Sequence, residues 1–317
     1  EAGVHSGDSA CVLPAQNLNR ETLNEIRSAT ESIAKSVGVK GLINIQFAVT
    51  TTSQSGEQKL YVLEANPRAS RTVPFVSKAT GVQLAKAAAL IAVGKSISEL
   101  RGMKVLPSSG DGIAHGVSVK EAVLPWNRFR RTDGIGVDSV LGPEMKSTGE
   151  VMGIDRNFAI AYAKSQSGAF GALPKSGAVF ISLSDRDKSE GVSSAKSLSQ
   201  LGFAIYATKG THDLLSKSGI AAFLVRKNSE GPGENPTSNQ LILDGKVNLV
   251  INTPLGRGAK QDGWLIRTAA VSKAIPCITT IAGFKAAVSA ISEMKGREFE
   301  VKPIQEWLDL NSRKQSA

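Results

Sequence analysis

The sequence predicts an α/β protein: an α+β first part that contains an antiparallel hairpin, followed by a doubly wound parallel sheet. Two observations predict this fold class. From about residue 178 onward, short β-like runs alternate with helical segments, which is typical of a parallel sheet covered by helices on both faces. Before residue 100, two strand-like runs follow one another with only a polar loop between them, which indicates a hairpin.

Length and composition limit how this fold can be organised. A chain of 317 residues is expected to hold about two domains, and we place the boundaries at 1–100, 101–169 and 170–317. The content of 41% hydrophobic and 21% charged residues excludes wholesale disorder. Because the chain starts at Glu1 without an initiator Met, we expect a fragment or a processed chain.

Neither a membrane nor a nucleic acid is an expected partner. The longest apolar stretches, such as Leu84–Val93, fall short of the ~18 residues that a spanning helix needs, and no secretory signal opens the chain. Cys11 and Cys277 lie far apart in the sequence. We therefore expect reduced thiols of a cytoplasmic protein and no disulfide framework. The net charge is +10, but the basic residues are scattered and only 5% of residues are aromatic. These features favour small phosphorylated ligands over nucleic acid.

In the first part, the apolar spacing of residues 20–37 predicts a helix that ends at Gly38. Residues 42–49 alternate in polarity as a strand does, and a second strand is expected over 60–63 after the polar loop 50–59. Leu84–Val93 is rich in Ala and predicts a buried helix.

The second part is more regular than the segment that leads into it. Residues 101–150 are expected to be irregular, and a helix over 157–166 is followed by a linker over 167–175. Strands are then predicted at 178–183, 203–208, 221–225, 248–253 and 276–281. Helices are predicted near 190–200, 211–218, 237–243, 259–274 and 283–294.

A carboxylate and two amides form the richest chemical cluster of the first part. Glu64 and Asn66 are two apart on a strand and therefore share a face, and Gln46 lies on the preceding strand. Their oxygens are hard ligands that suit Mg²⁺ or Mn²⁺ beside phosphate. Arg68 and Arg71 follow in one short loop, where they would neutralise charge on a transferring phosphoryl group. The spacing fits equally well a polar hairpin end with two solvated arginines.

Several longer strings carry a specific resemblance. They are HSGDSA (5–10), NIQFAV (44–49), EANPRASRTVPFVSKATG (64–81), VKEAVLPWNRF (119–129) and LGPEMKSTGEVMG (141–153). Together they resemble the C-terminal lobe of an ATP-grasp domain, and more closely the second ATP-grasp half of carbamoyl phosphate synthetase large chains. The loop 50–59 is longer than is usual in that family.

The resemblance implies an activity and a set of partners. Gln46, Glu64 and Asn66 match the ligands of two Mg²⁺ or Mn²⁺ ions, and Arg68 and Arg71 match arginines near the transferred phosphoryl group. Gly3, Val4, His5 and Ser6 match a strand that lines ATP. The implied reaction is phosphorylation of carbamate by ATP, with carbamate supplied by the rest of the large chain and a small glutaminase subunit. Because the other ATP-grasp lobe would precede Glu1, we expect the isolated chain to be inactive.

Three strand ends of the second part carry groups that bind phosphate: residues 182–188, 207–211 and 252–257. This part resembles the methylglyoxal-synthase-like allosteric domain of the same family. The positions that match effector contacts are Ser182, Lys188, Thr208, Thr211, Asn252 and Arg257. The implied effectors are UMP and IMP, with ornithine nearer the domain junction, although Pro254 and Gly258 depart from the family pattern. No catalytic Asp of a true methylglyoxal synthase is matched.

Two other descriptions remain open at this point. The chain would be a regulatory nucleotide-binding module if its first part were only a scaffold. It would be a different ATP-grasp ligase, such as a carboxylase component, if the resemblance were confined to that fold. The long strings at 64–81 and 141–153 and the appended α/β domain argue against the second of these.

Overall fold

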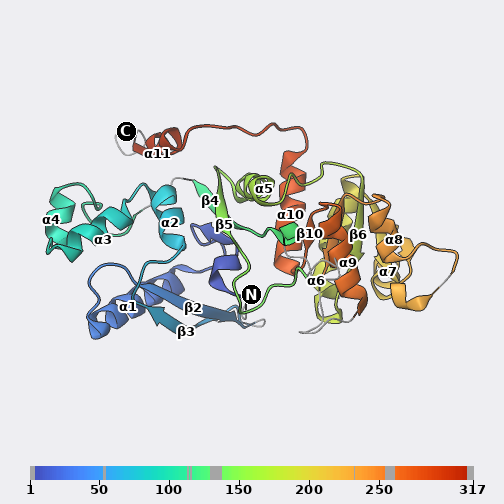
Figure 1. Cartoon of the computed structure of the whole chain (residues 1–317), viewed down its shortest axis with the longest axis horizontal. Coiled ribbons are helices and arrows are strands. Elements are labelled where there is room, and N and C mark those ends of the chain that lie inside the picture. Colours follow the sequence, from blue (N-terminus) through green and yellow to red (C-terminus); the bar gives the residue numbers. More distant parts are fainter. Residues whose placement is uncertain are drawn as a thin grey trace. The chain divides into compact units, whose positions relative to one another are not determined.

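The computed structural model in Figure 1 describes residues 4–52, 55–112, 114, 116–128, 138–231, 233–253 and 261–312. Its contacts divide the chain into two compact units. The first unit comprises residues 1–3, 11–120 and 301–317, and the second comprises 4–10 and 121–300. This division does not test the predicted domain boundaries at residues 100 and 169, which stay predictions.

The first helix of the first unit is the one that the sequence predicts. Helix α1 (Arg20–Val37) begins where the Asn19 side chain accepts a hydrogen bond from the Thr22 amide at 2.7 Å. It ends at Gly38, whose φ of 69° is the left-handed conformation that glycine adopts without a steric penalty. Strand β1 (Cys11–Leu13) pairs antiparallel with residues 118–120 of β4 (Val117–Val123).

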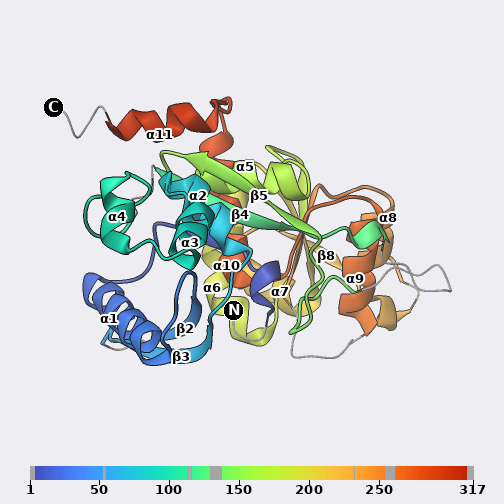
Figure 2. The ribbon, with the colours of Figure 1, turned by 60° about the vertical axis from the view of Figure 1, so that its left-hand side comes forward.

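The predicted hairpin is present, with its first strand shifted by two residues and its second strand longer than expected. Strand β2 (Asn44–Thr51) pairs antiparallel with β3 (Gln58–Asn66), and Figure 2 shows the pair beside α1. Both strands extend into the segment that was expected to be loop, because their alternating side chains continue the ladder as far as Thr51 and Gln58. A β-bulge between Gln46 and Phe47 shifts the register once.

Three short helices follow the hairpin: α2 (Thr72–Thr80), α3 (Leu84–Ala92) and α4 (Ile97–Gly102). The prediction of a buried helix over Leu84–Val93 is wrong in its burial. Only Ala87 of α3 is buried and Val93 is exposed, because α3 packs along its neighbours α2 and α4 and leaves its other side to solvent. Helix α11 (Ile304–Ser312) returns to α2 in the same unit.

In the second unit, β5 (Gly149–Asp155) packs against α5 (Phe158–Ala169). The helix runs three residues into the segment 167–175, which the sequence predicted to be a linker. The packing is close at Gly153, where a Cβ atom would stand 2.1 Å from the Ala161 carbonyl oxygen and 2.6 Å from the Ser165 amide nitrogen. The absence of a side chain at Gly153 therefore sets the spacing between helix and strand.

The parallel sheet confirms the predicted α/β class. Its strand order is β10-β9-β6-β7-β8, so that β6 is central. The strands are β6 (Ala178–Ser182), β7 (Ala204–Thr208), β8 (Phe223–Val225), β9 (Leu249–Asn252) and β10 (Cys277–Ile278). The helices are α6 (Lys188–Gln200), α7 (Lys209–Lys217), α8 (Ser238–Leu243), α9 (Gln261–Ser272) and α10 (Ile281–Met294).

Burial explains why this sheet forms from these residues. Val179, Phe180 and Ile181 of β6 and Leu249–Ile251 of β9 are fully buried, as expected for strands that helices cover on both faces. Within the described part of the chain, no helix is both long enough and apolar enough to cross a membrane.

Candidate functional site

The hairpin brings the predicted metal ligands together. Gln46 lies directly opposite Glu64 in the β2–β3 ladder, so the two side chains share a face. The amide nitrogen of Asn66 donates to a Glu64 carboxylate oxygen at 2.9 Å. Glu64 is exposed, whereas Gln46 and Asn66 are half-buried. The three side chains predicted to hold a metal thus lie on one face at one end of the hairpin.

The donor set fits a hard divalent cation, with a limit. All of its ligating atoms are oxygens, which suits Mg²⁺ or Mn²⁺. Only Glu64 carries charge, and the described residues contain no group of three or more His, Cys, Asp and Glu side chains that would hold a metal. The remaining charge and ligands would therefore have to come from phosphate oxygens.

Two arginines follow the metal-ligand set. Arg68 donates to the carbonyl of Ala69 at 3.0 Å, within its own loop. Arg71 stands at the N-cap of α2 and makes no side-chain capping bond to the helix. Both side chains are exposed, so a phosphoryl group brought to the hairpin end could meet them without displacing a buried ion pair.

The predicted nucleotide-lining residues 4–6 belong to the second unit, while Gly3 lies outside the described residues. Val4 is half-buried and Ser6 is exposed. His5 caps a short 3-10 helix, η1 (Ser6–Asp8), since its Nδ1 atom accepts from the Gly7 amide at 3.0 Å. Its backbone amide donates to the carbonyl of Gly142 at 2.8 Å.

Asp8 anchors this segment, a role that sequence reasoning missed. It is 2% exposed, and its two carboxylate oxygens accept from the amides of Lys146 and Ser147 at 2.8 and 2.9 Å. The Ser147 hydroxyl also donates to the Gly7 carbonyl at 3.1 Å. Two of the strings singled out by the sequence, 5–10 and 141–153, are therefore bound to each other.

In the parallel sheet, the three predicted phosphate-binding strand ends are neighbours. Ser182 at the end of β6 is the register partner of Asn252 at the end of β9. On the other side, the Thr208 hydroxyl at the end of β7 donates to the Ser182 hydroxyl at 3.2 Å. The chain runs from β6 to β7 on one side of β6, and from β9 to β10 on the other side. The ends of β6 and β9 therefore flank the point where the strand order reverses, which is where ligands bind in open α/β sheets.

The start of α7 is suited to an anion. Thr208 is the N-cap residue of α7, but its side chain makes no capping hydrogen bond to the first amides of the helix. The Lys188 ammonium group lies 3.0 Å from the place where a Cβ atom on Gly210 would stand. It pairs with the exposed Asp185 carboxylate at 2.6 Å. A cation beside the first amides of a helix is a phosphate-binding arrangement.

Thr211 and Thr253 hold the loop that follows β6. The Thr211 hydroxyl oxygen accepts from the Leu183 amide at 3.0 Å, and the Thr253 hydroxyl oxygen accepts from the Ser184 amide at 2.9 Å. Thr211 is 1% exposed, so this predicted effector contact is a buried support of the loop in the structure. Arg257, the last predicted contact, lies outside the described residues.

A buried cation next to Asn252 was not predicted. Arg267 on α9 is 3% exposed; it donates to both carboxylate oxygens of Asp138 at 2.6 Å and to the Asn252 side-chain oxygen at 2.7 Å. Nearby, burial raises the pKa of the Cys277 thiol to about 12, and the Arg267 guanidinium opposes that rise. No periodicity or short motif indicates this cluster, because its members are 15 and 129 positions from Arg267.

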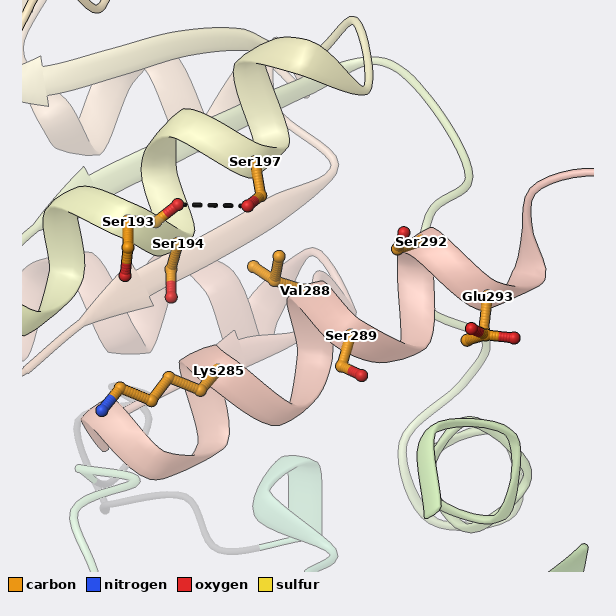
Figure 3. A pocket seen from close by; sticks show the side chains of 8 residues that line it. All are labelled: Ser193, Ser194, Ser197, Lys285, Val288, Ser289, Ser292 and Glu293. Carbon is orange, nitrogen blue, oxygen red and sulfur yellow. Dashed lines mark hydrogen bonds between the residues drawn. The ribbon is translucent and has the colours of Figure 1, made fainter. Parts of the chain in front are cut away.

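A separate groove runs between α6 and α10 (Figure 3). It has a volume of about 340 Å³ and is lined mainly by serine side chains of both helices, with Lys285 and Glu293 on α10. Ser197 returns its hydroxyl to the Ser193 carbonyl at 3.1 Å. None of the residues predicted to bind a ligand lines this groove, so the candidate site remains at the strand ends.

Two protein-family models match the chain. Residues 2–100 match the carbamoyl-phosphate synthase L chain, ATP binding domain, and residues 190–279 match the MGS-like domain. The first match contains the hairpin with Gln46, Glu64 and Asn66. The second contains Thr208, Thr211 and Asn252, along with Arg267.

Curated relatives are similar to this chain over nearly its whole length. Carbamoyl phosphate synthase large chains are 54% identical in Streptomyces avermitilis, 55% in Pseudarthrobacter chlorophenolicus and 54% in Streptomyces coelicolor. Each alignment covers 96% of this chain and 28% of the relative, so the chain spans little more than a quarter of their length. The crystal structure of ForH is similar over 44% of this chain and 92% of its own, at 18% identity and a TM-score of 0.29, which is too low to bear on the fold.

Proposed function

The chain is homologous over 96% of its length to part of the carbamoyl phosphate synthase large chain, and from this premise we propose its role in the whole enzyme. It contributes metal ligands and arginines to the ATP-dependent phosphorylation of carbamate to carbamoyl phosphate. It also contributes a site for nucleotide effectors. The observation that supports the first role is the register of the hairpin, which places Gln46 opposite Glu64 and joins Glu64 to Asn66.

In this proposal, Gln46, Glu64 and Asn66 hold Mg²⁺ or Mn²⁺ against the phosphates of ATP. When bound, the cations neutralise charge that develops on the transferred group. The single carboxylate suits this task, because a site with one negative charge binds the cation mainly together with phosphate and releases it with the nucleotide.

The arginines complete the hairpin's part of the proposed ATP site. Arg68 and Arg71 orient the transferred phosphoryl group and stabilise charge on its oxygens. Val4, His5 and Ser6 are proposed as nucleotide contacts from the resemblance alone, and His5 is held in place by its bonds to Gly7 and Gly142. The partners in this role are the rest of the large chain, which supplies the other lobe, and a small glutaminase subunit that supplies ammonia.

The effector site is proposed at the carboxyl ends of β6, β7 and β9. Lys188 and the first turn of α7 take the phosphate of a nucleoside monophosphate such as UMP or IMP, and Ser182, Thr208 and Asn252 contact the nucleoside. Arg257 is proposed as a further contact. Ornithine is proposed as a second effector at a separate place.

The catalytic role is tested in the whole large chain with its small subunit. Glu64→Gln is expected to lower ATP-dependent carbamoyl phosphate formation roughly a hundredfold, because loss of the only charged ligand weakens metal binding. Glu57→Gln is the matched control, since Glu57 is an exposed carboxylate in the loop of the same hairpin. Equal activity of both variants would contradict the proposed metal site.

The isolated chain tests the effector role by itself. We expect UMP and IMP to raise its melting temperature, and ATP with Mg²⁺ to leave both the melting temperature and the ATP concentration unchanged. A hundredfold excess of UMP over its Kd stabilises the folded chain by about 2.7 kcal/mol. ATP-dependent turnover by the isolated chain would contradict the proposal that the rest of the large chain supplies half of the ATP site.

A further inference from the structure

Arg267 and Asn252 form a buried pair at the ligand end of β9. The Arg267 side chain uses Nε and Nη2 for the two oxygens of Asp138, at 2.6 Å each, and Nη1 for Oδ1 of Asn252 at 2.7 Å. Asn252 is 5% exposed. Both ends of the guanidinium are thus occupied, and its position is fixed by a bidentate ion pair.

This contact determines which way the Asn252 amide faces. A guanidinium has only donors, so the atom that meets it must be the amide oxygen, and a flipped amide would oppose two donors. The amide nitrogen therefore faces away from Arg267. Among the residues that the structure describes, that nitrogen has no hydrogen-bond partner. Asn252 consequently offers a ligand the donors of its amide nitrogen.

The place of Asn252 in the sheet indicates which part of a ligand it meets. The phosphate-binding groups, Lys188 and the start of α7, adjoin the end of β7. Strand β9 lies two positions away across β6, which corresponds to roughly 10 Å at the usual strand spacing. A ligand held by its phosphate at α7 would reach Asn252 with its far end, which in a nucleotide is the base.

We propose that Arg267 is a positioning residue that makes the site select a nucleobase with a carbonyl group over one with an amino group at the edge that reaches Asn252. This inference rests on the proposed effector function. A carbonyl oxygen accepts from the Asn252 amide, whereas an amino group places two donors against each other and leaves both unpaired. UMP and CMP differ at one such group, as do IMP and AMP.

Gly263 gives a second way to disturb the same contact. A Cβ atom at Gly263 would stand 2.9 Å from Nη1 of Arg267 and 3.6 Å from Oδ1 of Asn252. Gly263→Ala therefore pushes on the guanidinium, which its three hydrogen bonds prevent from yielding freely, while every charge stays in place. A loss of selectivity in this variant reports the position of Arg267 and not its charge.

The experiment measures the affinity of the full chain for UMP, CMP, IMP and AMP by isothermal titration calorimetry. The wild type is expected to bind UMP about 10–100-fold more tightly than CMP, and IMP more tightly than AMP by a similar factor. Arg267→Met frees the amide to rotate and brings both ratios toward 1, and Arg267→Lys restores part of them. Gly263→Ala lowers both ratios.

Asn252→Asp gives the sharpest result and keeps Arg267 paired. One carboxylate oxygen replaces Oδ1 at the guanidinium and the other presents an acceptor, so the preference should reverse in favour of CMP. Arg27→Met is the control, because it removes an exposed Arg–Asp pair of the first unit and should leave every ratio unchanged.

The outcomes separate this inference from the function on which it rests. Equal binding of UMP and CMP by the wild type, or an unchanged ratio in Arg267→Met, overturns the role of Arg267 and leaves the effector site in place. If Arg267→Met does not fold, Asn252→Asp decides, and a preference for UMP in that variant overturns the inference. Absence of binding by all four nucleotides overturns the effector site itself.

Discussion

The β2–β3 hairpin and the five-stranded sheet carry the two proposed sites on very different foundations. On β3, three consecutive apolar side chains, Tyr61, Val62 and Leu63, are 43–54% exposed. On β6, Val179, Phe180 and Ile181 are all 0% exposed. Strand β3 of the first unit is thus exposed to solvent on both faces, whereas β6 of the second unit is buried on both faces.

This contrast teaches where function can be sought in this chain. The proposed effector site is built on the ends of buried strands, so its residues keep their places without a further partner. The proposed metal-ligand set lies on a two-stranded ribbon, and isolated ribbons are marginally stable. We therefore expect nucleotide binding at the sheet to be measurable in the isolated chain and metal binding at the hairpin to need the whole enzyme.

The largest expected effect concerns the stability of the two strands. Phe180→Ala should lower the free energy of unfolding by about 3–5 kcal/mol, because it opens a cavity in a closed core. Val62→Ala should cost less than about 1 kcal/mol, because that side chain is half exposed. Scanning calorimetry of both variants measures the difference. Equal losses would show that the hairpin is as closed in solution as the sheet.

A smaller effect is expected on ligand binding. Lys188→Ala should weaken the binding of UMP about 10–100-fold, because the phosphate loses a charge-assisted hydrogen bond. Lys285→Ala is the matched control, since Lys285 lines the serine-rich groove of Figure 3 and pairs with Glu190. Calorimetric titration measures both. Loss of binding in Lys285→Ala alone would move the nucleotide site to that groove.

The free energy of unfolding of the second unit, which contains Cys277, should depend on pH in the alkaline range. Burial raises the pKa of Cys277 from 9.0 to about 12, so the unfolded chain releases this proton first as the pH rises. The contribution of the buried thiol is complete below about pH 9 and is lost between pH 9 and 12. Denaturation of Cys11→Ala with and without Cys277→Ala, at pH 8–11, tests this. Parallel stability curves for the two proteins would contradict it.

The smallest effect is expected at an exposed helix start of the first unit. Hydrogen bonds from the Lys95 ammonium and from the amide and hydroxyl of Ser96 lower the pKa of Glu99 to about 2. This capping interaction is present above about pH 4.5 and is lost as the pH falls toward 2. Hydrogen-exchange protection of α4 should decline over that range. Glu99→Gln should already have low protection at pH 6 and should show no such decline.

Much of the fold could be predicted because its signals are local. The helix over residues 20–37 has both ends as predicted, since apolar spacing and a terminal glycine depend only on neighbouring residues. The five parallel strands were likewise each visible as short apolar runs. Helix α2 was not predicted, because Pro74 and four β-branched residues in TVPFVSKAT argue against a helix, although Pro is tolerated in a first turn.

The candidate site was predictable only in part, for the opposite reason. Spacing alone indicated that Glu64 and Asn66 share a face, because they are two residues apart. The neighbourhood of Ser182 and Asn252 depends on strand order, which no local pattern contains. Asp8 and Arg267 escaped notice because each is defined by partners more than a hundred positions away, Ser147 and Asp138 respectively.

The contact of α5 with β5 has a consequence for tolerance to mutation. Any codon change at Gly153 that yields another amino acid adds at least one carbon atom, in a space already occupied by the backbone of Ala161 and Ser165. Backbone cannot rotate aside as the end of a side chain can, so even alanine should separate the helix from the strand. A glycine at this position in GEVMG is therefore a physical requirement of the fold.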